Sequence, residues 1–213
     1  MPDQLTNHPK ESLVKQLEIA VGISNVIYKP EDLLIYSYDA SIDRATPNVV
    51  VLPGSTVEIS ECVKAANAHG ATIVPRGAGT GLSGGAIPLN DSVVIGVSRL
   101  NKILSVDVNN RTAIVEPGLV NIELSNHVGK YGLYYAPDPS SQKACTIGGN
   151  VAENAGGPHC LALGTTTNHV LGMEVVLADG SIVWLGGENR EYSGYDLRGA
   201  LIGSEGTFAI VTK

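Results

Sequence analysis

The stretch Pro75–Gly85, PRGAGTGLSGG, holds five glycines in eleven residues. Within it, Gly79–Gly84 fits the G-x-G-x-x-G pattern of a dinucleotide-binding Rossmann turn. That fingerprint requires a helix that begins among the glycines, so that the helix N-terminus meets a pyrophosphate. The residues on either side of the stretch decide whether this interpretation holds, and they also indicate the fold class.

The residues after the glycines predict a loop and a strand. Pro88 disfavours a helix, and the mostly β-branched run Val93–Val97 favours a strand. The helix of this unit is predicted before the glycines, where Ser55-x-x-Glu58 forms a capping box. Its apolar face would carry Ile59, Cys62, Val63 and Ala66, and Gly70 would end it. The Rossmann interpretation is therefore rejected.

Strands flank this helix at residues 49–52 and 71–75, and a strand–helix–strand unit predicts two parallel strands. Hairpins follow, and the second crosses Asp179-Gly180, a dipeptide typical of a type I′ turn. The remaining expected elements are helices over 11–21 and from Pro117-Gly118 to Gly132, the latter with Leu124, Val128 and Tyr131 on one face, and strands over 103–108, 112–116, 174–178, 181–185 and 207–211. This order predicts the α+β class with two subdomains.

The glycine-rich stretch can bind an anion even without a helix. Successive backbone N–H groups in such a turn make a concave anion site. Gly77, Gly79 and Gly81 can adopt positive φ and let phosphate oxygens approach the main chain. The alternative is a plain surface loop, but a flexible linker would need neither a strand that leads into it nor Arg76 within it. We therefore predict an anion-binding loop.

A second unusual segment runs from Tyr135 to His169 without clear periodicity. Long loops of this kind are usually functional or disordered, and its low charge and scattered small apolar residues argue against disorder. Its small and polar side chains can surround an extended ligand closely. The turn Gly203–Thr207 has the same character on a smaller scale.

The composition excludes several classes of protein. The chain has 213 residues, 43% of them hydrophobic, and a net charge of −7 without a basic stripe, which argues against nucleic acid as a partner. No apolar run approaches the ~20 residues that span a bilayer, and the N-terminus lacks the apolar region of a secretory signal. Cys62, Cys145 and Cys160 have no metal-ligand spacing and favour free thiols in a reducing cytoplasm.

Four motifs follow one another along the chain: PRGAGTGLSGG, PDPSSQKACTIGGNVAENAGGPHC, LGTTTNHVLGMEVVLADG and GSEGTFAIVTK. Together they resemble the FAD-binding domain of the vanillyl-alcohol-oxidase/p-cresol-methylhydroxylase class. Within that class the similarity is closest to the FAD-linked subunit of bacterial glycolate oxidase and its D-lactate dehydrogenase relatives. The resemblance implies a PCMH-type domain of two α+β subdomains with FAD between them. It also suggests an N-terminal helical segment over 1–45 and an FAD-binding domain over 46–213.

The resemblance further implies where the cofactor is held. The glycine stretch would cradle the FAD pyrophosphate, the PD…TIGG segment would line the rest of the cofactor, and the SEGT…I motif would lie near its nucleotide or flavin portion. The residues so assigned are Pro75, Arg76, Gly77, Ala78, Gly79, Thr80, Gly81, Ser83, Pro137, Asp138, Ser141, Thr146, Gly148, Gly149, Asn154, Gly157, Thr165, Glu205, Gly206 and Ile210. Some relatives tether the flavin through a histidine at the position that Thr80 takes here, so we expect noncovalent FAD.

The activity implied by the resemblance is oxidation of a 2-hydroxy acid, of the glycolate or D-lactate type, to a 2-oxo acid, with partner subunits of an oxidase complex. This reaction needs a base for the hydroxyl proton and cations for the carboxylate. His159 and His169 lie in the flavin-lining stretches, but a histidine bonded to the backbone is the commoner role, and we assign no catalytic base. Arg76 fits a cofactor-binding or loop-closing role better than a substrate clamp, and no metal motif is present.

Members of the class continue into a cap domain that supplies most substrate contacts, whereas this chain stops at Lys213. We therefore expect a truncated product or one piece of a longer or split protein, nearly inactive alone. The alternatives are an FAD-binding module without independent activity and a UDP-N-acetylenolpyruvoylglucosamine reductase-like flavoprotein, which the second and fourth motifs fit less well. The expected location is the cytoplasm, with attachment to the inner face of the membrane through a partner subunit as the alternative.

Overall fold

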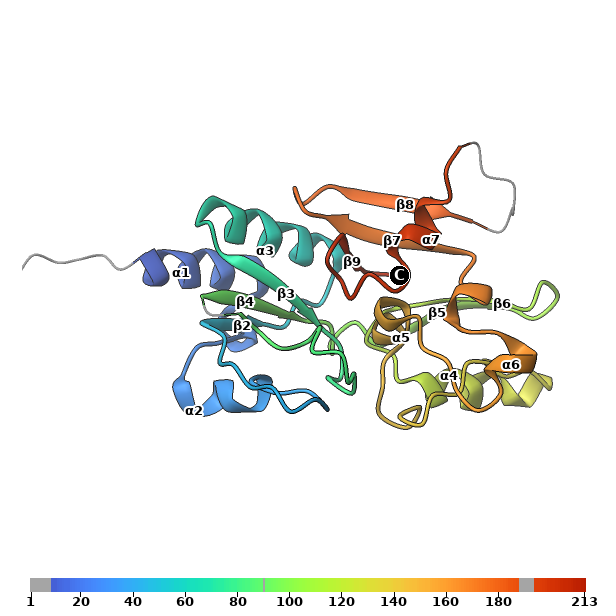
Figure 1. Ribbon diagram of the computed structural model, residues 1–213. Helices are drawn as coiled ribbons and strands as arrows, with labels where there is room; N and C mark the ends of the chain where they lie inside the picture. Colours follow the sequence, from blue (N-terminus) through green and yellow to red (C-terminus); the bar gives the residue numbers. More distant parts are fainter. Residues whose placement is uncertain (1–8, 90, 188–193) are drawn as a thin grey trace, which may run out of the picture.

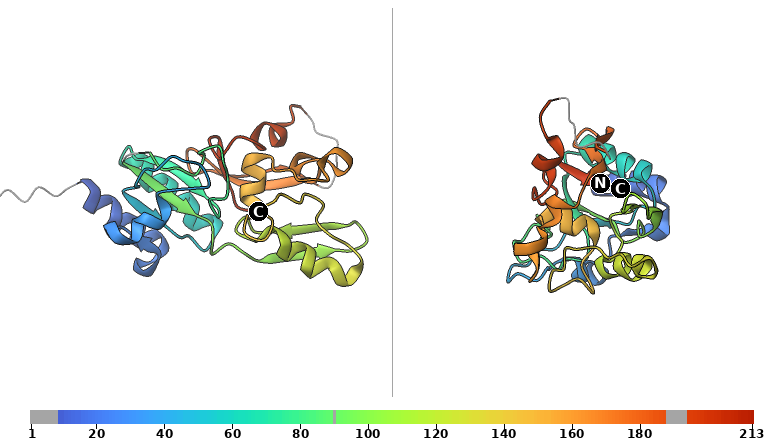
Figure 2. Two further views of the ribbon diagram at one scale, coloured as in Figure 1. Left: turned by 60° about the horizontal axis from the view of Figure 1, so that its bottom comes forward. Right: turned by 90° about the vertical axis from the view of Figure 1, so that its right-hand side faces the viewer.

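The computed structural model describes residues 9–89, 91–187 and 194–213. Its strands form three sheets: four strands in the order β1-β2-β4-β3, the hairpin β5-β6, and three strands in the order β8-β7-β9. The strands are β1 (Val26–Ile27), β2 (Val49–Val51), β3 (Thr72–Arg76), β4 (Ser92–Gly96), β5 (Ile103–Asp107), β6 (Thr112–Val115), β7 (Gly172–Leu177), β8 (Ile182–Gly186) and β9 (Ala209–Val211). The four-stranded sheet lies at one end of an elongated molecule and the other two sheets lie at the other end (Figures 1 and 2).

Short helices surround these sheets. They are α1 (Pro9–Val21), α2 (Pro30–Leu33), α3 (Thr56–Ala68), α4 (Asn121–Val128), α5 (Ile147–Glu153), α6 (Cys160–Leu163) and α7 (Leu197–Leu201), with four 3-10 turns, η1 (Ile23–Asn25), η2 (Leu34–Tyr36), η3 (Gly129–Tyr131) and η4 (Thr166–Asn168). Helices and hairpins in this mixture confirm the α+β class. The division of the chain at residues 45 and 46 stays a prediction.

The two central strands of the four-stranded sheet, β2 and β4, are buried on both faces, which explains their continuous valine-rich sequences. Val49 and Val51 of β2 belong to the core formed with α1 and α3, whereas the alternate residue Val50 packs with Leu33 of α2. As predicted, β2 and β3 run parallel, but they are not neighbours, because β4 lies between them and pairs with both. The C-terminal end of β3 leads directly into the glycine-rich stretch.

Helix α3 begins and ends where the sequence predicts. The Ser55 hydroxyl accepts a hydrogen bond from the Glu58 N–H (3.2 Å), and Gly70 follows the helix with φ of +63°. The Glu58 carboxylate accepts from the Gly54 N–H (2.7 Å) and not from Ser55, so one half of the capping box forms. The four residues of the predicted apolar face are all buried.

Two details of the second half differ from the expectations. Among the residues of the β7–β8 turn, Gly180 alone has positive φ (+85°), and its N–H donates to the Leu177 carbonyl (2.9 Å). The turn is therefore not type I′, which requires two residues with positive φ. Tyr131 is 47% exposed, because α4 ends at Val128 and a 3-10 turn carries Tyr131 off the buried face.

The long segment from Tyr135 to His169 contains three short helical elements that the sequence did not indicate. The most important is α5, where the Thr146 hydroxyl accepts from the Gly149 N–H (3.3 Å). The N–H groups of Ile147 and Gly148 donate to the carbonyls of Leu119 (2.9 Å) and Pro117 (2.8 Å). Contacts with distant parts of the chain therefore hold this helix, which has two glycines among its seven residues.

Candidate functional site

The glycine loop, which we define as Gly77–Gly85, lies where three segments far apart in the sequence meet. On one side is the N-terminal segment Tyr36–Ala40, whose Ala40 N–H donates to the Gly81 carbonyl (3.1 Å). On the other side are α5 and the turn Gly203–Gly206. The N–H groups of Gly203 and Glu205 bind the carbonyls of Val151 (2.9 Å) and Ala152 (2.8 Å), so this turn is fixed to α5.

The backbone of the glycine loop presents unused donors. Within the described part of the chain, no N–H from Gly77 to Gly85 donates a hydrogen bond to another protein group. Gly79 (φ +68°) and Gly84 (φ +84°) have the left-handed conformation, whereas Gly77 and Gly81 do not, so the expectation of positive φ was correct for one glycine of the three. A run of unbonded N–H groups bent by such residues is the arrangement that binds anions.

Protein side chains occupy the space that other residues at these glycines would fill. A Cβ at Gly77, Gly79, Gly81 or Gly85 would lie under 3.0 Å from a side-chain atom of Thr146, Arg76, Glu153 or Glu205, respectively. Real Cβ atoms do not make such contacts. The glycines therefore allow α5, the 203–206 turn and Arg76 to approach the loop, in addition to leaving its backbone open to a ligand.

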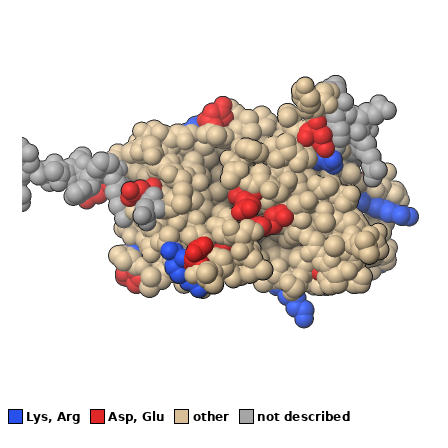
Figure 3. Space-filling view, viewed as in Figure 1, with Lys and Arg blue, Asp and Glu red and all other residues tan. Residues whose placement is uncertain are grey.

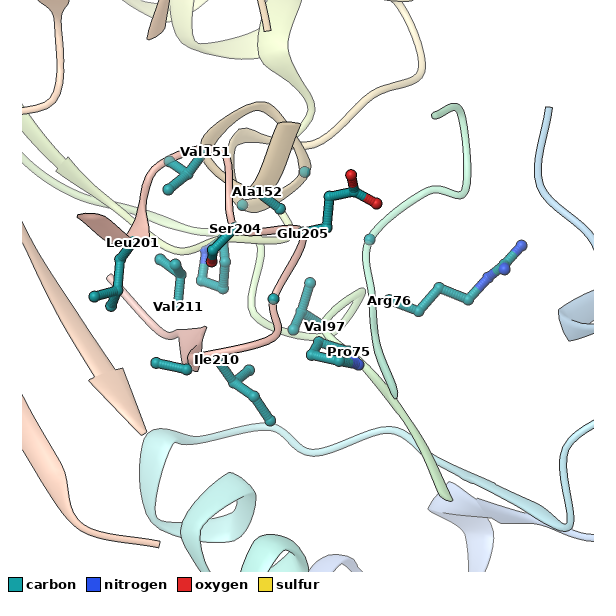
Figure 4. A pocket seen from close by; sticks show the side chains of 16 residues that line it. Pro75, Arg76, Val97, Val151, Ala152, Leu201, Ser204, Glu205, Ile210 and Val211 are labelled. Atoms are coloured by element: carbon teal, nitrogen blue, oxygen red, sulfur yellow. The ribbon is translucent and has the colours of Figure 1, made fainter. Parts of the chain in front are cut away.

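Beside the loop is a cavity of about 60 Å³, shown in Figure 4. The predicted site residues that line it are Pro75, Arg76, Gly77, Gly148, Gly149, Glu205, Gly206 and Ile210. Sequence reasoning missed other lining residues, including Val97, Pro117 and Ser204. Small-molecule sites usually measure 300–1,000 Å³. The cavity by itself is therefore smaller than a usual small-molecule site.

Twelve predicted residues do not line this cavity. Five of them belong to the glycine loop itself (Ala78, Gly79, Thr80, Gly81 and Ser83), and the other seven are Pro137, Asp138, Ser141, Thr146, Asn154, Gly157 and Thr165. Several make internal contacts. The Asn154 side chain accepts from the Thr167 N–H (3.0 Å), and Thr165 caps η4. Eight of the predicted residues line the cavity, but the sequence motifs did not show which side chains face it.

The two histidines of the long segment both have protein partners. Nδ1 of His159 lies 2.5 Å from Asp138, and this hydrogen bond lowers the pKa of the Asp138 carboxyl. Nε2 of His169 donates to the Leu163 carbonyl (2.8 Å), which is the backbone-bonded role expected from the sequence. Neither geometry identifies a catalytic base.

Sequence reasoning missed the acidic residue Glu153, which lies beside the loop near the predicted residue Glu205. The Ser83 hydroxyl donates to Glu153 (3.1 Å) at the end of α5. Burial raises the pKa of Glu153, and the nearby charges of Glu205 and Asp39 raise it further. Acidic side chains are visible near the middle of a largely uncharged face in Figure 3. The signal available was that Glu153 is a rare charge within a small-residue segment.

These features define a class of protein before any comparison: an α+β domain with a glycine loop whose unbonded backbone donors suit a phosphate-containing ligand. Residues 47–186 match the family model described as FAD binding domain, and the chain belongs to this family. The predicted cofactor, FAD, is thereby confirmed.

Two curated relatives are similar over most of this chain. Glycolate oxidase subunit GlcD of Bacillus subtilis is 41% identical over 211 residues, which are 98% of this chain and 44% of that protein. D-lactate dehydrogenase of Archaeoglobus fulgidus is 40% identical over 193 residues, which are 88% of this chain and 43% of that protein. The predicted resemblance is confirmed, and the chain spans less than half the length of both relatives.

Solved structures confirm the fold. The 4-ethylphenol oxidase of Gulosibacter chungangensis superposes with a TM-score of 0.82 at 24% identity, over 100% of this chain and 43% of that one. p-Cresol methylhydroxylase superposes with a TM-score of 0.74 at 22% identity, over 100% and 44%. Among the described residues, no helix has the length and apolar character needed to cross a membrane.

Proposed function

We propose that this chain is the FAD-binding part of an oxidoreductase that converts a 2-hydroxy acid, of the glycolate or D-lactate type, to a 2-oxo acid. The observation that carries the proposal is the run of unbonded N–H groups from Gly77 to Gly85 beside the cavity. The names of the two curated relatives support the substrate class. Bound FAD supplies the acceptor for the substrate hydride.

The glycine loop is proposed to hold the pyrophosphate through its backbone. Among the described lining residues of the cavity, Arg76 is the one cation, and its side chain points away from the cavity in Figure 4. Neutral N–H groups of Gly77, Ala78, Gly79 and Thr80 would therefore carry the anion, as in other backbone nests. Thr80 has no ring nitrogen to form a flavin bond, which supports noncovalent attachment.

The substrate side of the active site is proposed to lie in the part of the relatives that this chain does not span. Catalysis requires a base and carboxylate-binding cations, and the histidines near the site are bonded within the protein. Partner subunits of an oxidase complex are proposed because one relative is named as a subunit. Three free cysteines support the proposed location in a reducing compartment, the cytoplasm.

The test is the identity and attachment of the bound flavin. We expect the purified protein to carry FAD and not FMN. The glycine loop, the segment from Tyr135 to His169 and the turn Gly203–Thr207 together offer more contacts than a mononucleotide needs. Acid precipitation should release the FAD into the supernatant for chromatography. FMN in the supernatant would contradict the dinucleotide site, and yellow colour that stays with the precipitate would contradict noncovalent attachment.

A further inference from the structure

We propose that Arg76 is a positioning residue that shapes the glycine loop, because its side chain joins the two ends of the loop to each other and to the Tyr36–Ala40 segment. The position of the Arg76 guanidinium also explains why residue 79 is a glycine. The first half of the proposal concerns the protein alone. Its consequence for cofactor affinity rests on the proposed function, in which the glycine loop binds FAD.

Arg76 is a buried cation whose partners are backbone carbonyls. It is 7% exposed, Nη1 donates to the Ala86 carbonyl (3.1 Å), and Nη2 donates to the Tyr38 carbonyl (2.6 Å). The guanidinium also lies 5.9 Å from the centre of the Tyr36 ring, within the range of a cation–π contact. Because a guanidinium is a rigid fork of donors, these contacts fix its position.

The contacts of Arg76 close the loop. Arg76 precedes Gly77 and Ala86 follows Gly85, so the Nη1 bond joins the two ends of the glycine loop. The bond from the Ala40 N–H to the Gly81 carbonyl holds its middle against the N-terminal segment. All of these bonds use loop carbonyls or the Arg76 side chain, and none uses an N–H of the loop. The loop is thereby held in shape while its N–H groups remain available to an anion.

Gly79 is constrained by this arrangement. A Cβ at position 79 would collide with Nη2 and would lie 2.8 Å from Cζ of Arg76. Elsewhere a long side chain could move aside, but the guanidinium here is held by two carbonyls. A side chain at position 79 should therefore act through Arg76, in addition to the strain of its positive φ.

A second arginine and glycine offer a matched control outside the loop. Arg99 Nη1 donates to the Leu52 carbonyl (2.7 Å), and a Cβ at Gly54 would lie 2.8 Å from Arg99 Nη2. Neither residue lines the cavity. Substitution of Arg99 or Gly54 should therefore change the free energy of unfolding without changing the cofactor site.

The experiment is a double-mutant cycle on the full chain, with FAD affinity measured by quenching of flavin fluorescence. Arg76→Met should raise the FAD dissociation constant about tenfold, the scale expected when charged hydrogen bonds are lost, and Arg76→Lys should fall between Met and the parent. Gly79→Ala should weaken binding strongly in the parent but much less in the Arg76→Met background. Arg99→Met, Gly54→Ala and their double variant should leave the dissociation constant within about twofold.

Hydrogen exchange of residues 36–45 in the FAD-free protein gives a readout that does not depend on FAD. Arg76→Met should speed exchange there, because Ala40 is bonded to the loop, and Arg99→Met should not. Equal exchange in the parent and in both Arg76 variants would overturn the proposal, as would independent effects of Arg76→Met and Gly79→Ala on affinity. If the parent binds no FAD while exchange changes as expected, the proposed function fails and the positioning role stands.

Discussion

At the scale of the residue, Glu153 should make the stability of the FAD-free protein depend on pH. Burial raises the pKa of its carboxyl, with Glu205 and Asp39 adding to the effect. A folded pKa above the unfolded one means that protonation stabilises the fold at low pH, and that this contribution is lost as pH rises through the folded pKa. Ionised Glu153 should therefore destabilise the FAD-free protein at neutral pH.

We expect Glu153→Gln to make the FAD-free protein more stable than the parent at pH 7. The amide oxygen can still accept from Ser83, so the gain should come from removal of the charge. Because the Glu153 side chain is only partly buried and solvent screens its charge, the gain should be below about 1 kcal/mol. Urea unfolding at pH 4 and pH 7 measures it, with Glu31→Gln in α2 as control. A gain that grows toward pH 4 would contradict the assignment.

Single residues also show where sequence reasoning stopped. The density of glycines predicted a backbone open to phosphate oxygens, but the sequence could not show that side chains of the protein also approach it, namely those of Thr146, Arg76, Glu153 and Glu205. Of these four residues, Glu153 belongs to α5 and Thr146 is the N-cap of α5, a helix that local patterns did not reveal. Such contacts join distant segments and leave no local signal.

At the scale of the element, α5 joins the glycine loop to the 203–206 turn. We expect Thr146→Ala to cost about 1 kcal/mol of unfolding free energy, because the helix loses its side-chain cap. It should also weaken FAD binding, because Gly148 and Gly149 of this helix line the cavity. Chemical unfolding and fluorescence titration of the same samples would measure both effects.

The control is Ser55→Ala, which removes the corresponding cap of α3. A similar loss of stability with unchanged FAD affinity would show that the effect of Thr146 on binding is specific to α5. Equal losses of affinity in the two variants would mean that general destabilisation, and not the position of α5, governs binding.

Elements differ in how much of their structure the sequence determines locally. Helix α3 has a cap, a periodic apolar face and a terminal glycine, so its limits could be predicted. The insertion of β4 between β2 and β3 could not, because strand order depends on pairings between distant residues. Seven residues with two glycines make α5 a weak helix by propensity, and its bonds to Leu119 and Pro117 are tertiary.

At the scale of the whole molecule, the motifs and their order predicted the fold and the cofactor, and the comparisons confirmed both. The site was predicted as a set of segments, of which eight residues line the cavity. What the sequence could not provide is the direction of each side chain, since Asn154 and Thr165 serve internal bonds instead. That distinction matters for activity, because a site needs groups that face the substrate.

We expect the 213-residue chain, loaded with FAD, to show little turnover of glycolate or D-lactate with a dye as electron acceptor. Orientation of the reacting groups can supply ~7–11 kcal/mol of a barrier, and it requires a base and cations that face the substrate. Here His159 is bonded to Asp138 and His169 to the Leu163 carbonyl. The comparison is the Bacillus subtilis relative in the same assay, of which this chain spans 44%. Equal turnover per FAD would place the catalytic groups within these residues, and loss of that turnover in His169→Gln would then identify the base.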